Sequence, residues 1–253
     1  MMHVIKKYRY TLISVLSIIL FFVFWELLLH IFNISQTILV KPSDIIDTVI
    51  NNLDILTKEM IYTIQEIIFG WIIGNSLGLV SALLIYRNKK FSNSLVNTSI
   101  LINSIPLIAL TAILGGIVGN NQIQKIVIVS LVTFFPMFIS SLHELTSIDE
   151  KHNDLLLSYS ASHKQILNKV LLPKSLPTIL NTIKVSTILA IFTAVTSEFF
   201  GGYAGIGVFI LSKRGLYNLK LVWAGIMFIT IFGTIFYFSV SFIQKKIITW
   251  QKT

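Results

Sequence analysis

The sequence predicts an all-α membrane protein with about six transmembrane helices. Only 12% of its 253 residues are charged, about half the share found in ordinary soluble domains. Mean hydropathy is +0.80, and several apolar runs approach the ~20 residues that a helix needs to cross a bilayer. We therefore expect one transmembrane domain covering residues 1–253 and no separate soluble domain.

Six apolar runs define the expected spans, which are 11–32, 62–86, 95–118, 123–144, 178–200 and 219–243. The first follows a basic N-terminus, as in a signal peptide. It is longer than the ~7–15 residues of a signal-peptide core, and no small-residue cleavage site follows it. We interpret it as a retained first span.

Basic residues orient these spans, because cytoplasmic loops of membrane proteins are enriched in Lys and Arg. With a cytoplasmic N-terminus, six of the 20 basic residues fall outside, namely Lys41, Lys58, Lys125, Lys213, Arg214 and Lys220, and the other 14 fall inside. Both termini are then predicted to be cytoplasmic, and the segment 146–177 becomes the largest cytoplasmic loop.

The remaining composition excludes several classes of protein. The net charge of +9 comes from short packets of Lys and Arg between apolar runs, which does not indicate nucleic-acid binding. No cysteine is present, and the five histidines form no metal-binding motif. No phosphate-binding G-x-x-x-x-G-K-[ST] occurs, so we expect no ATPase site, cofactor or metal in this chain.

Two features are expected on the outer side. Pro42 followed by Ser43 and Asp44 predicts the start of a short surface helix in the first outer loop. The glycine-rich stretch 201–207 lacks the βαβ context of a dinucleotide fingerprint, and we expect it to form a tight re-entrant or hairpin turn.

Small residues recur at every fourth position of the second span, at Gly70, Gly74, Gly78 and Ala82. Such a stripe lets two helix backbones approach closely, and van der Waals packing is a main force that joins helices in lipid. We predict a tight helix–helix contact here.

Polar residues mark the third and fifth spans as possible pathway helices; the residues are Asn103, Ser104, Pro106, Ser186, Thr193 and Ser197. A proline in a membrane helix frees a carbonyl group, which neighbours or a water-lined cavity must satisfy. Such helices either line a pathway or are only kinked, and both readings stay open. The acids Glu26, Glu66 and Glu198 fall near the outer ends of their spans. An acid within the membrane usually points into a bundle or cavity, but so close to the interface we expect these three to meet water.

The cytoplasmic segment 154–177 is predicted to form a compact knob of two short helices. Ser160, Ala161 and Ser162 are small enough for a tight turn between them. The second helix, about 163–172, has apolar residues on one face and is expected to end at Pro173. An ATPase could grip this knob, or its apolar face could rest on the membrane surface.

This knob resembles the signature loop of ABC-importer permeases, written E-A-A-x-x-x-G and followed by I-x-L-P. Aligning Val170–Pro173 with I-x-L-P places Asp154, Leu155 and Leu156 at E-A-A and Ser160 at the glycine. The subgroup similar to importers of nitrate, sulfonates, taurine and thiamine precursors continues with G-A-S-x-x-Q-I and L-P-x-x-L-P-x-I. Matching residues are Ser160–Ala161–Ser162, Gln165–Ile166, Leu172–Pro173, Leu176–Pro177 and Ile179.

The departures from the family pattern lie at the alanines and the glycine. Leu155 and Leu156 replace the two alanines, and Ser160 replaces a glycine that would adopt a positive φ without cost. Further matches to the family pattern lie at Trp25–Glu26, Pro42–Ser43, Phe135–Pro136 and Glu198. The resemblance therefore covers about residues 20–245 in order.

The resemblance implies a MetI-like ABC-importer permease fold in the cytoplasmic (inner) membrane. It implies a homodimer with one pathway, ATPase subunits seated on the knobs, and an extracytoplasmic solute-binding protein that delivers a small solute such as a sulfonate, nitrate or thiamine precursor. The residues assigned to ATPase coupling are Asp154, Leu155, Leu156, Ser158, Ser160, Ala161, Ser162, Gln165 and Pro173.

Two other classes of function are open to an apolar chain with several spans. A stand-alone secondary transporter or channel would require paired ionisable residues near the bilayer midplane, whereas the candidate acids lie towards the outer side. A membrane scaffold or enzyme subunit would need neither the knob nor the polar fifth span.

Overall fold

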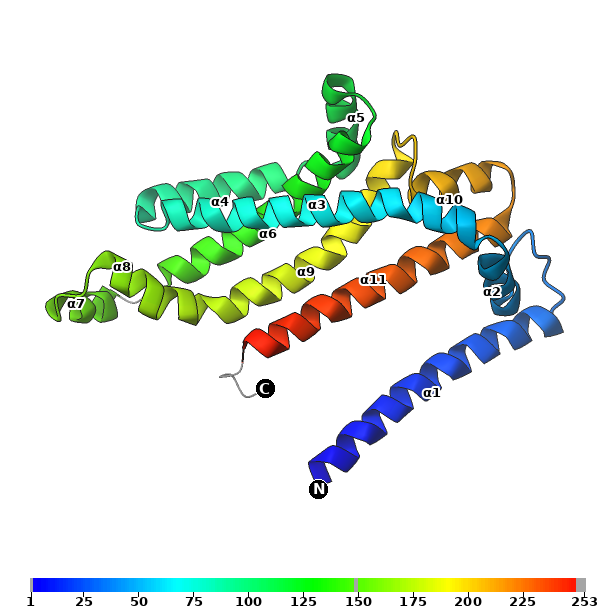
Figure 1. Ribbon diagram of the computed structural model, residues 1–253, viewed down its shortest axis with the longest axis horizontal. Coiled ribbons are helices and arrows are strands. Elements are labelled where there is room, and N and C mark those ends of the chain that lie inside the picture. The colour runs from blue at the N-terminus through cyan, green and yellow to red at the C-terminus, as the bar shows by residue number, and fades with distance from the viewer. Residues whose placement is uncertain (1, 148–149, 249–253) are drawn as a thin grey trace. The chain divides into compact units, whose positions relative to one another are not determined.

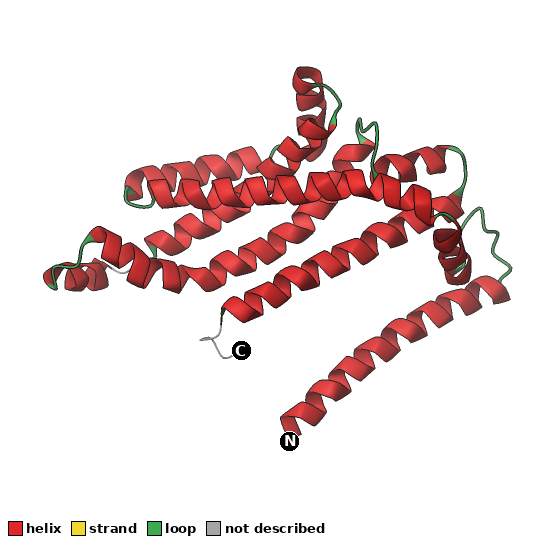
Figure 2. Cartoon of the chain, viewed as in Figure 1, coloured by secondary structure: helices red, strands yellow, loops and turns green. Residues whose placement is uncertain are grey.

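The structure, a computed structural model, describes residues 2–147 and 150–248, all of whose regular elements are helices (Figures 1 and 2). The helices in chain order are α1 (Met2–Ile31), α2 (Pro42–Asn51), α3 (Leu53–Ile85), α4 (Lys89–Asn103), α5 (Leu107–Val118), α6 (Gln122–Thr146), α7 (Glu150–Ser158), α8 (His163–Ile166), the π-helix η1 (Leu167–Leu171), α9 (Leu172–Phe199), α10 (Ile206–Gly215) and α11 (Leu219–Ile247). The all-α prediction is confirmed.

Within the described ranges, four helices are long and apolar enough to cross a membrane: α3, α6, the continuous helix His163–Phe199, and α11. Two shorter apolar helices, Leu16–Ile31 and Leu107–Val118, fall in the regions of the first and third expected spans. The chain divides into two compact units, which are described separately. One contains the chain up to Thr57 together with Phe209–Phe228, and the other contains Lys58–Val208 together with the chain from Ile229 onward.

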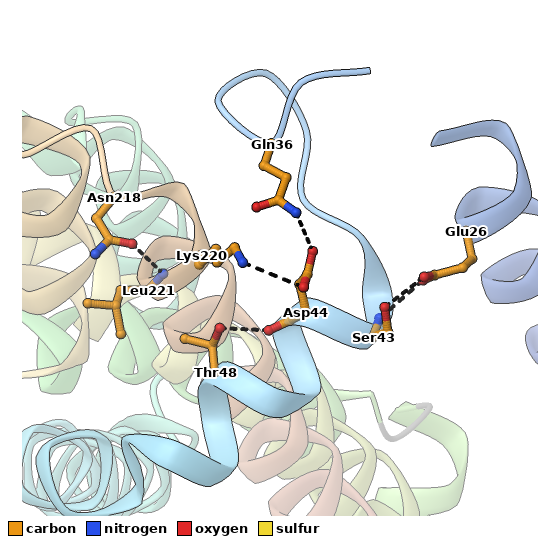
Figure 3. Close-up of polar contacts among 8 residues, drawn as sticks. All are labelled: Glu26, Gln36, Ser43, Asp44, Thr48, Asn218, Lys220 and Leu221. Carbon is orange, nitrogen blue, oxygen red and sulfur yellow. Dashed lines mark hydrogen bonds and ion pairs between the residues drawn. The ribbon is translucent and has the colours of Figure 1, made fainter. Parts of the chain in front are cut away.

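In the first unit, polar contacts attach the N-terminal end of α2 to its surroundings (Figure 3). The helix predicted from Pro42 is present, with the proline in its first turn, where a missing N–H costs nothing. The Ser43 hydroxyl and backbone N–H donate to the carboxylate of Glu26 over 2.7 and 3.1 Å. Asp44 forms an ion pair of 3.5 Å with Lys220.

In the second unit, α6 packs extensively on α9, and α4 and α5 each pack against α6. Its core at the end that carries α8 consists of apolar side chains from α3, α6 and the α8–η1 segment; the fully buried members are Ala82, Phe138, Leu142, Leu145, Ile166 and Leu171. This core supports the knob.

The third expected span, 95–118, is not one helix. It breaks into α4 and α5 at Pro106, whose extended backbone (φ −58°, ψ 130°) starts α5. Proline lacks an N–H and disfavours helical geometry in the residue before it. The chain tightens before the break, because the Ser104 and Ile105 N–H groups donate three residues back instead of four.

The expectation that Pro173 ends the second knob helix is wrong. The helix runs without interruption from His163 to Phe199, through the π-helical turn η1. In η1 the Leu172 N–H donates to the Leu167 carbonyl, one residue further back than in an α-helix. This wider turn gives Pro173 a place in the first turn of α9, where its missing N–H and its ring are tolerated.

Candidate functional site

The turn between α7 and α8 is a helix C-cap of the Schellman type. The Ala161 N–H donates to the Leu156 carbonyl over 3.2 Å, and the Ser160 N–H donates to the Leu157 carbonyl over 2.8 Å. Ser160 has a φ of 59°, in the left-handed region that glycine adopts most easily. The structure thus gives a physical reason for the glycine of the related loops, and serine occupies that position here at a cost of about 1 kcal/mol.

The next helix begins at Ser162 with a capping box. The Gln165 N–H donates to the Ser162 hydroxyl oxygen over 3.3 Å, and the Ser162 N–H donates to the Gln165 side-chain carbonyl over 2.7 Å. Two of the N–H groups left open at a helix start are therefore satisfied by the helix's own residues.

The apolar face of the knob is covered by protein. Ile166 and Leu171 are buried in the core with Leu142 and Leu145 of α6 and Ala82 of α3. Lys174 Nζ donates to the Ser147 hydroxyl over 3.0 Å, and the Thr178 hydroxyl donates to Glu144 over 3.0 Å. The knob is therefore attached to α6, and this apolar face does not lie on a membrane surface.

The opposite side of the knob is exposed. Of the residues assigned to ATPase coupling, Leu156 and Ala161 are half-buried, and the exposed ones are Asp154, Leu155, Ser158, Ser160, Ser162, Gln165 and Pro173. Sequence reasoning missed Tyr159, which is 77% exposed next to Leu155 at 53%. The signal was available, because an aromatic residue in a polar turn is an unusual exposure of apolar surface.

The glycine stripe of α3 faces α6. A Cβ at Gly70 would lie 2.5 Å from the Cβ of Val129, and one at Gly78 would lie 2.7 Å from the Phe134 carbonyl oxygen. At Gly74 a Cβ would collide with the Thr133 hydroxyl and the Ser130 carbonyl. Ala82, the fourth member, is fully buried in the core beneath the knob.

The expected pathway residues fall in different places. Ser186 and Ser197 are fully buried within the protomer. Thr193 is also buried, but it borders a cavity of about 260 Å³ whose other walls come from α4, α5, α6 and the segment that joins α4 to α5. Ser104 and Pro106 are exposed at the α4–α5 break, and Asn103 ends α4, with its side chain outside the described set.

Ser186 joins α9 to α3 through hydrogen bonds. Its hydroxyl donates to Asn75 Oδ1 over 3.0 Å and accepts from the Trp71 indole N–H over 2.9 Å. Asn75 Nδ2 donates in turn to the Trp71 carbonyl over 2.7 Å. The polar face noticed in the fifth span is, at this position, an interhelical contact.

At the other end of α9, Glu198 is held by two other segments of the second unit, α3 and the first turn of α10. Its carboxylate accepts from the Thr63 hydroxyl of α3 over 2.6 Å and from the Gly207 N–H of α10 over 2.5 Å. The same Thr63 oxygen accepts from the Ile206 N–H over 2.8 Å, and Glu59 accepts from the Gly205 N–H over 2.9 Å.

Two further ionisable residues are buried next to this arrangement. Glu66 is 2% exposed and Lys125 is 1% exposed. Lys125 Nζ donates to Gln124 Oε1 over 2.9 Å, and Gln124 Nε2 donates to the Thr111 carbonyl of α5 over 2.7 Å. The expectation that Glu66 and Glu198 meet water is wrong, because α3, α6 and α10 cover them.

The glycine-rich stretch after α9 forms a tight turn, with φ of 129° at Gly201 and 116° at Gly205, and then starts α10. Gly205 and Gly207 pack directly against the Glu198 carboxylate, where a Cβ would collide with it. The sequence predicted the turn, but it predicted neither α10, which follows the turn, nor the packing of Glu198 against it.

Three basic residues of the first unit lie on α10 or shortly after it, namely Lys213, Arg214 and Lys220. Lys220 pairs with Asp44 over 3.5 Å. Lys213 Nζ lies 5.3 Å from the centroid of the Phe209 ring, within the ~6 Å typical of cation–π pairs. Arg214 borders an open cavity with Leu211, Tyr217 and Leu219.

Residues 74–249 match the family described as the inner membrane component of binding-protein-dependent transport systems. The chain belongs to this family. The knob, the exposed turn and the α9 helix all lie within the matched range.

The relatives named in this comparison are permeases. A putative aliphatic sulfonates transport permease of Bacillus subtilis is 26% identical over 90% of this chain and 84% of its own length. A formylaminopyrimidine transport permease of Halalkalibacterium halodurans is 23% identical over 90% of this chain and 94% of its own. The taurine transport system permease of Escherichia coli is 24% identical over 78% of this chain and 68% of its own length.

Among solved structures, an inward-facing form of the MetNI methionine ABC transporter aligns with a TM-score of 0.59 at 21% identity, covering 73% of this chain and 90% of that chain. The expected MetI-like fold is confirmed. The chain is thus the inner membrane permease subunit of a binding-protein-dependent ABC importer, and ATP hydrolysis belongs to a partner subunit.

Proposed function

We propose that this permease imports a small solute, such as a sulfonate, nitrate or a thiamine precursor, which a solute-binding protein delivers from outside. The relatives named for sulfonates, taurine and formylaminopyrimidine support this range of solutes. The basic residues Lys213 and Arg214 favour either an anion within this range or acidic lobes of the binding protein.

ATPase coupling is assigned to the exposed side of the knob, from Asp154 to Gln165. The supporting observation is the contrast between its two sides: Ile166 and Leu171 are buried against α6, while Leu155 and Tyr159 are exposed. A rigidly attached projection with apolar side chains at its tip is the geometry that a second protein can push on.

The permease is proposed to work as a homodimer with one pathway at its interface and with both termini in the cytoplasm. Alternating access follows from movement of the knobs, and no chemistry is done on the solute. Family membership favours this permease over a stand-alone transporter or channel. Among the pathway residues proposed here, Thr193 has the strongest support, because it borders a cavity.

Co-purification from membranes tests the coupling assignment. The tagged chain should recover an ABC ATPase, and replacement of residues 158–162 by a Gly/Ser stretch should abolish that recovery. The matched control replaces the exposed residues 35–37 by Gly/Ser and should retain the ATPase. Recovery that is equal in both variants would contradict the assignment of the knob.

Uptake experiments test the solute. Cells with and without the chain are compared for uptake of labelled taurine, nitrate and formylaminopyrimidine. Loss of uptake of one of these in the deleted strain, restored by the chain, identifies the solute, whereas unchanged uptake of all three would contradict the proposed class.

A further inference from the structure

The buried arrangement around Glu198 supplies acceptors from other helices to three successive N–H groups at the start of α10. The N–H groups of Gly205, Ile206 and Gly207 donate to Glu59, Thr63 and Glu198, respectively. The first N–H groups of a helix have no partner within it, and an unsatisfied one costs several kcal/mol in a membrane. The start of α10 is therefore fixed by side chains of α3 and α9.

Glycine makes this contact possible. Gly205 and Gly207 have no Cβ, and the Glu198 carboxylate occupies the space that a Cβ at either position would need. The Gly202 N–H donates to the Glu198 carbonyl over 2.9 Å, so the turn is also closed onto the end of α9. Glu198 thus holds both ends of the segment 202–207: its backbone carbonyl binds Gly202, and its side chain binds Gly207.

We call the contacts of Glu59, Thr63 and Glu198 with residues 205–207 the clamp. The helix that ends at the clamp begins in the knob. His163–Phe199 is a continuous helix of 37 residues, about 55 Å long at 1.5 Å per residue. Its irregular features, η1, Pro173 and Pro177, lie near the knob, and from Thr178 to Phe199 it contains neither proline nor glycine. The part between Thr178 and Glu198 is therefore built to move as one body.

We propose that Glu198, through Thr63, is a positioning residue that transmits movement of α9 to the turn 200–205 and the first turn of α10. This inference rests on the proposed function, in which the ATPase moves the knob. The last turn of the same α10 carries Lys213 and Arg214, so the clamp connects ATP-driven movement to the helix proposed to meet the binding protein.

A carboxyl group suits the clamp because it offers two acceptor oxygens. Oε1 of Glu198 accepts from the Thr63 hydroxyl, and Oε2 accepts from the Gly207 N–H. One side chain therefore joins α3 to the start of α10.

Spin labels test the proposal, and the absence of cysteine from the chain makes single labels straightforward. One label replaces Tyr203 in the turn, which is 62% exposed, and a second, in a separate sample, replaces the exposed Lys164 in the knob. Spectra of the permease–ATPase complex are compared before and after trapping with ATP and vanadate. Each label is placed in the wild-type, Thr63→Val and Thr63→Ser backgrounds.

Thr63→Val keeps the shape of the side chain but removes the hydroxyl that bridges Glu198 and Ile206, whereas Thr63→Ser retains it. We expect trapping to change the Tyr203 spectrum in the wild type and in Thr63→Ser. In Thr63→Val this change should fall at least fivefold while the Lys164 change persists. Glu198→Gln, measured in the same way, decides the question if Thr63→Val does not assemble.

An equal Tyr203 response in wild type, Thr63→Val and Glu198→Gln would overturn the clamp. So would a wild-type Tyr203 label that does not respond while the Lys164 label does. A Lys164 label that is insensitive to the ATPase and to trapping would instead overturn the proposed function itself, which separates the two failures.

Discussion

Glu198 accepts a hydrogen bond of 2.6 Å from the hydroxyl of Thr63, a residue 135 positions earlier in the chain. The contact joins the end of α9 to α3 inside a region where both side chains are almost fully buried. Buried polar groups in a membrane protein persist only when paired. The pair is therefore part of the framework of the second unit. In the proposal above, it is the contact through which movement of α9 reaches the start of α10.

The Gly74 contact predicts a steep loss of stability on enlargement. Gly74→Ala places a methyl group against the Thr133 hydroxyl and the Ser130 carbonyl, so we expect a loss of about 1–3 kcal/mol. Thermal unfolding in detergent measures it. Gly116→Ala is the matched control, because nothing lies within 4 Å of its Cβ and alanine favours the helix. Equal melting temperatures for the two variants would contradict the close contact of α3 with α6.

The hydrogen bonds of Ser186 predict a specific cost for its removal. Ser186→Ala leaves Asn75 Oδ1 without its donor and weakens the partnership of the Trp71 indole, which we expect to cost about 1–3 kcal/mol. Ser239→Ala is the control, since that exposed hydroxyl only donates back to the Ile235 carbonyl of its own helix. The same unfolding measurement should show the control within about 0.5 kcal/mol of the wild type.

Ser160 predicts a stabilising substitution in the knob. Ser160→Gly relieves the left-handed backbone and should stabilise the turn by about 1 kcal/mol, whereas Ser160→Val should destabilise it by at least as much. Hydrogen exchange of the Ser160 and Ala161 amides in the assembled complex reports the local effect. Ser158→Gly, in the last turn of α7, should speed exchange instead. Faster exchange in Ser160→Gly would contradict the turn described here.

Charge reversal tests the docking of the binding protein at α10. Lys213→Glu with Arg214→Glu should weaken binding of the solute-binding protein at least tenfold, because both charges lie in the last turn of α10. The ATPase rate of the complex without binding protein should stay unchanged. Lys245→Glu with Lys246→Glu, at the end of α11, provides the control of equal charge. Unchanged affinity in the first variant would rule out this docking surface.

Short-range signals in the sequence were sufficient for much of the fold. The start of α2 follows from Pro42, and the turn at 160–162 follows from three small residues, because both depend only on neighbouring backbone groups. The break at Pro106 and the continuity at Pro173 show where local reasoning fails. Judged from its neighbours alone, either proline would interrupt a helix. Only Pro173 is accommodated, by a π-helical turn whose side chains pack against α6.

The polar residues show the same division. Sequence identified Ser186, Thr193 and Ser197 as polar residues within one membrane helix, because composition along a span is a local property. It did not reveal that Trp71 and Asn75 meet Ser186, or that Glu66, Lys125 and Glu198 are buried together, because these partners come from helices far apart in the chain.

The sequence by itself determined that this protein is helical, resides in a membrane and carries the knob of an importer permease, because hydropathy, helix period and a contiguous motif are all written locally. Only the tertiary structure decided that one helix runs from the knob to Glu198 and that Thr63, Gly205 and Gly207 meet it there. Those contacts depend on where α3, α9 and α10 pack, which no local pattern specifies.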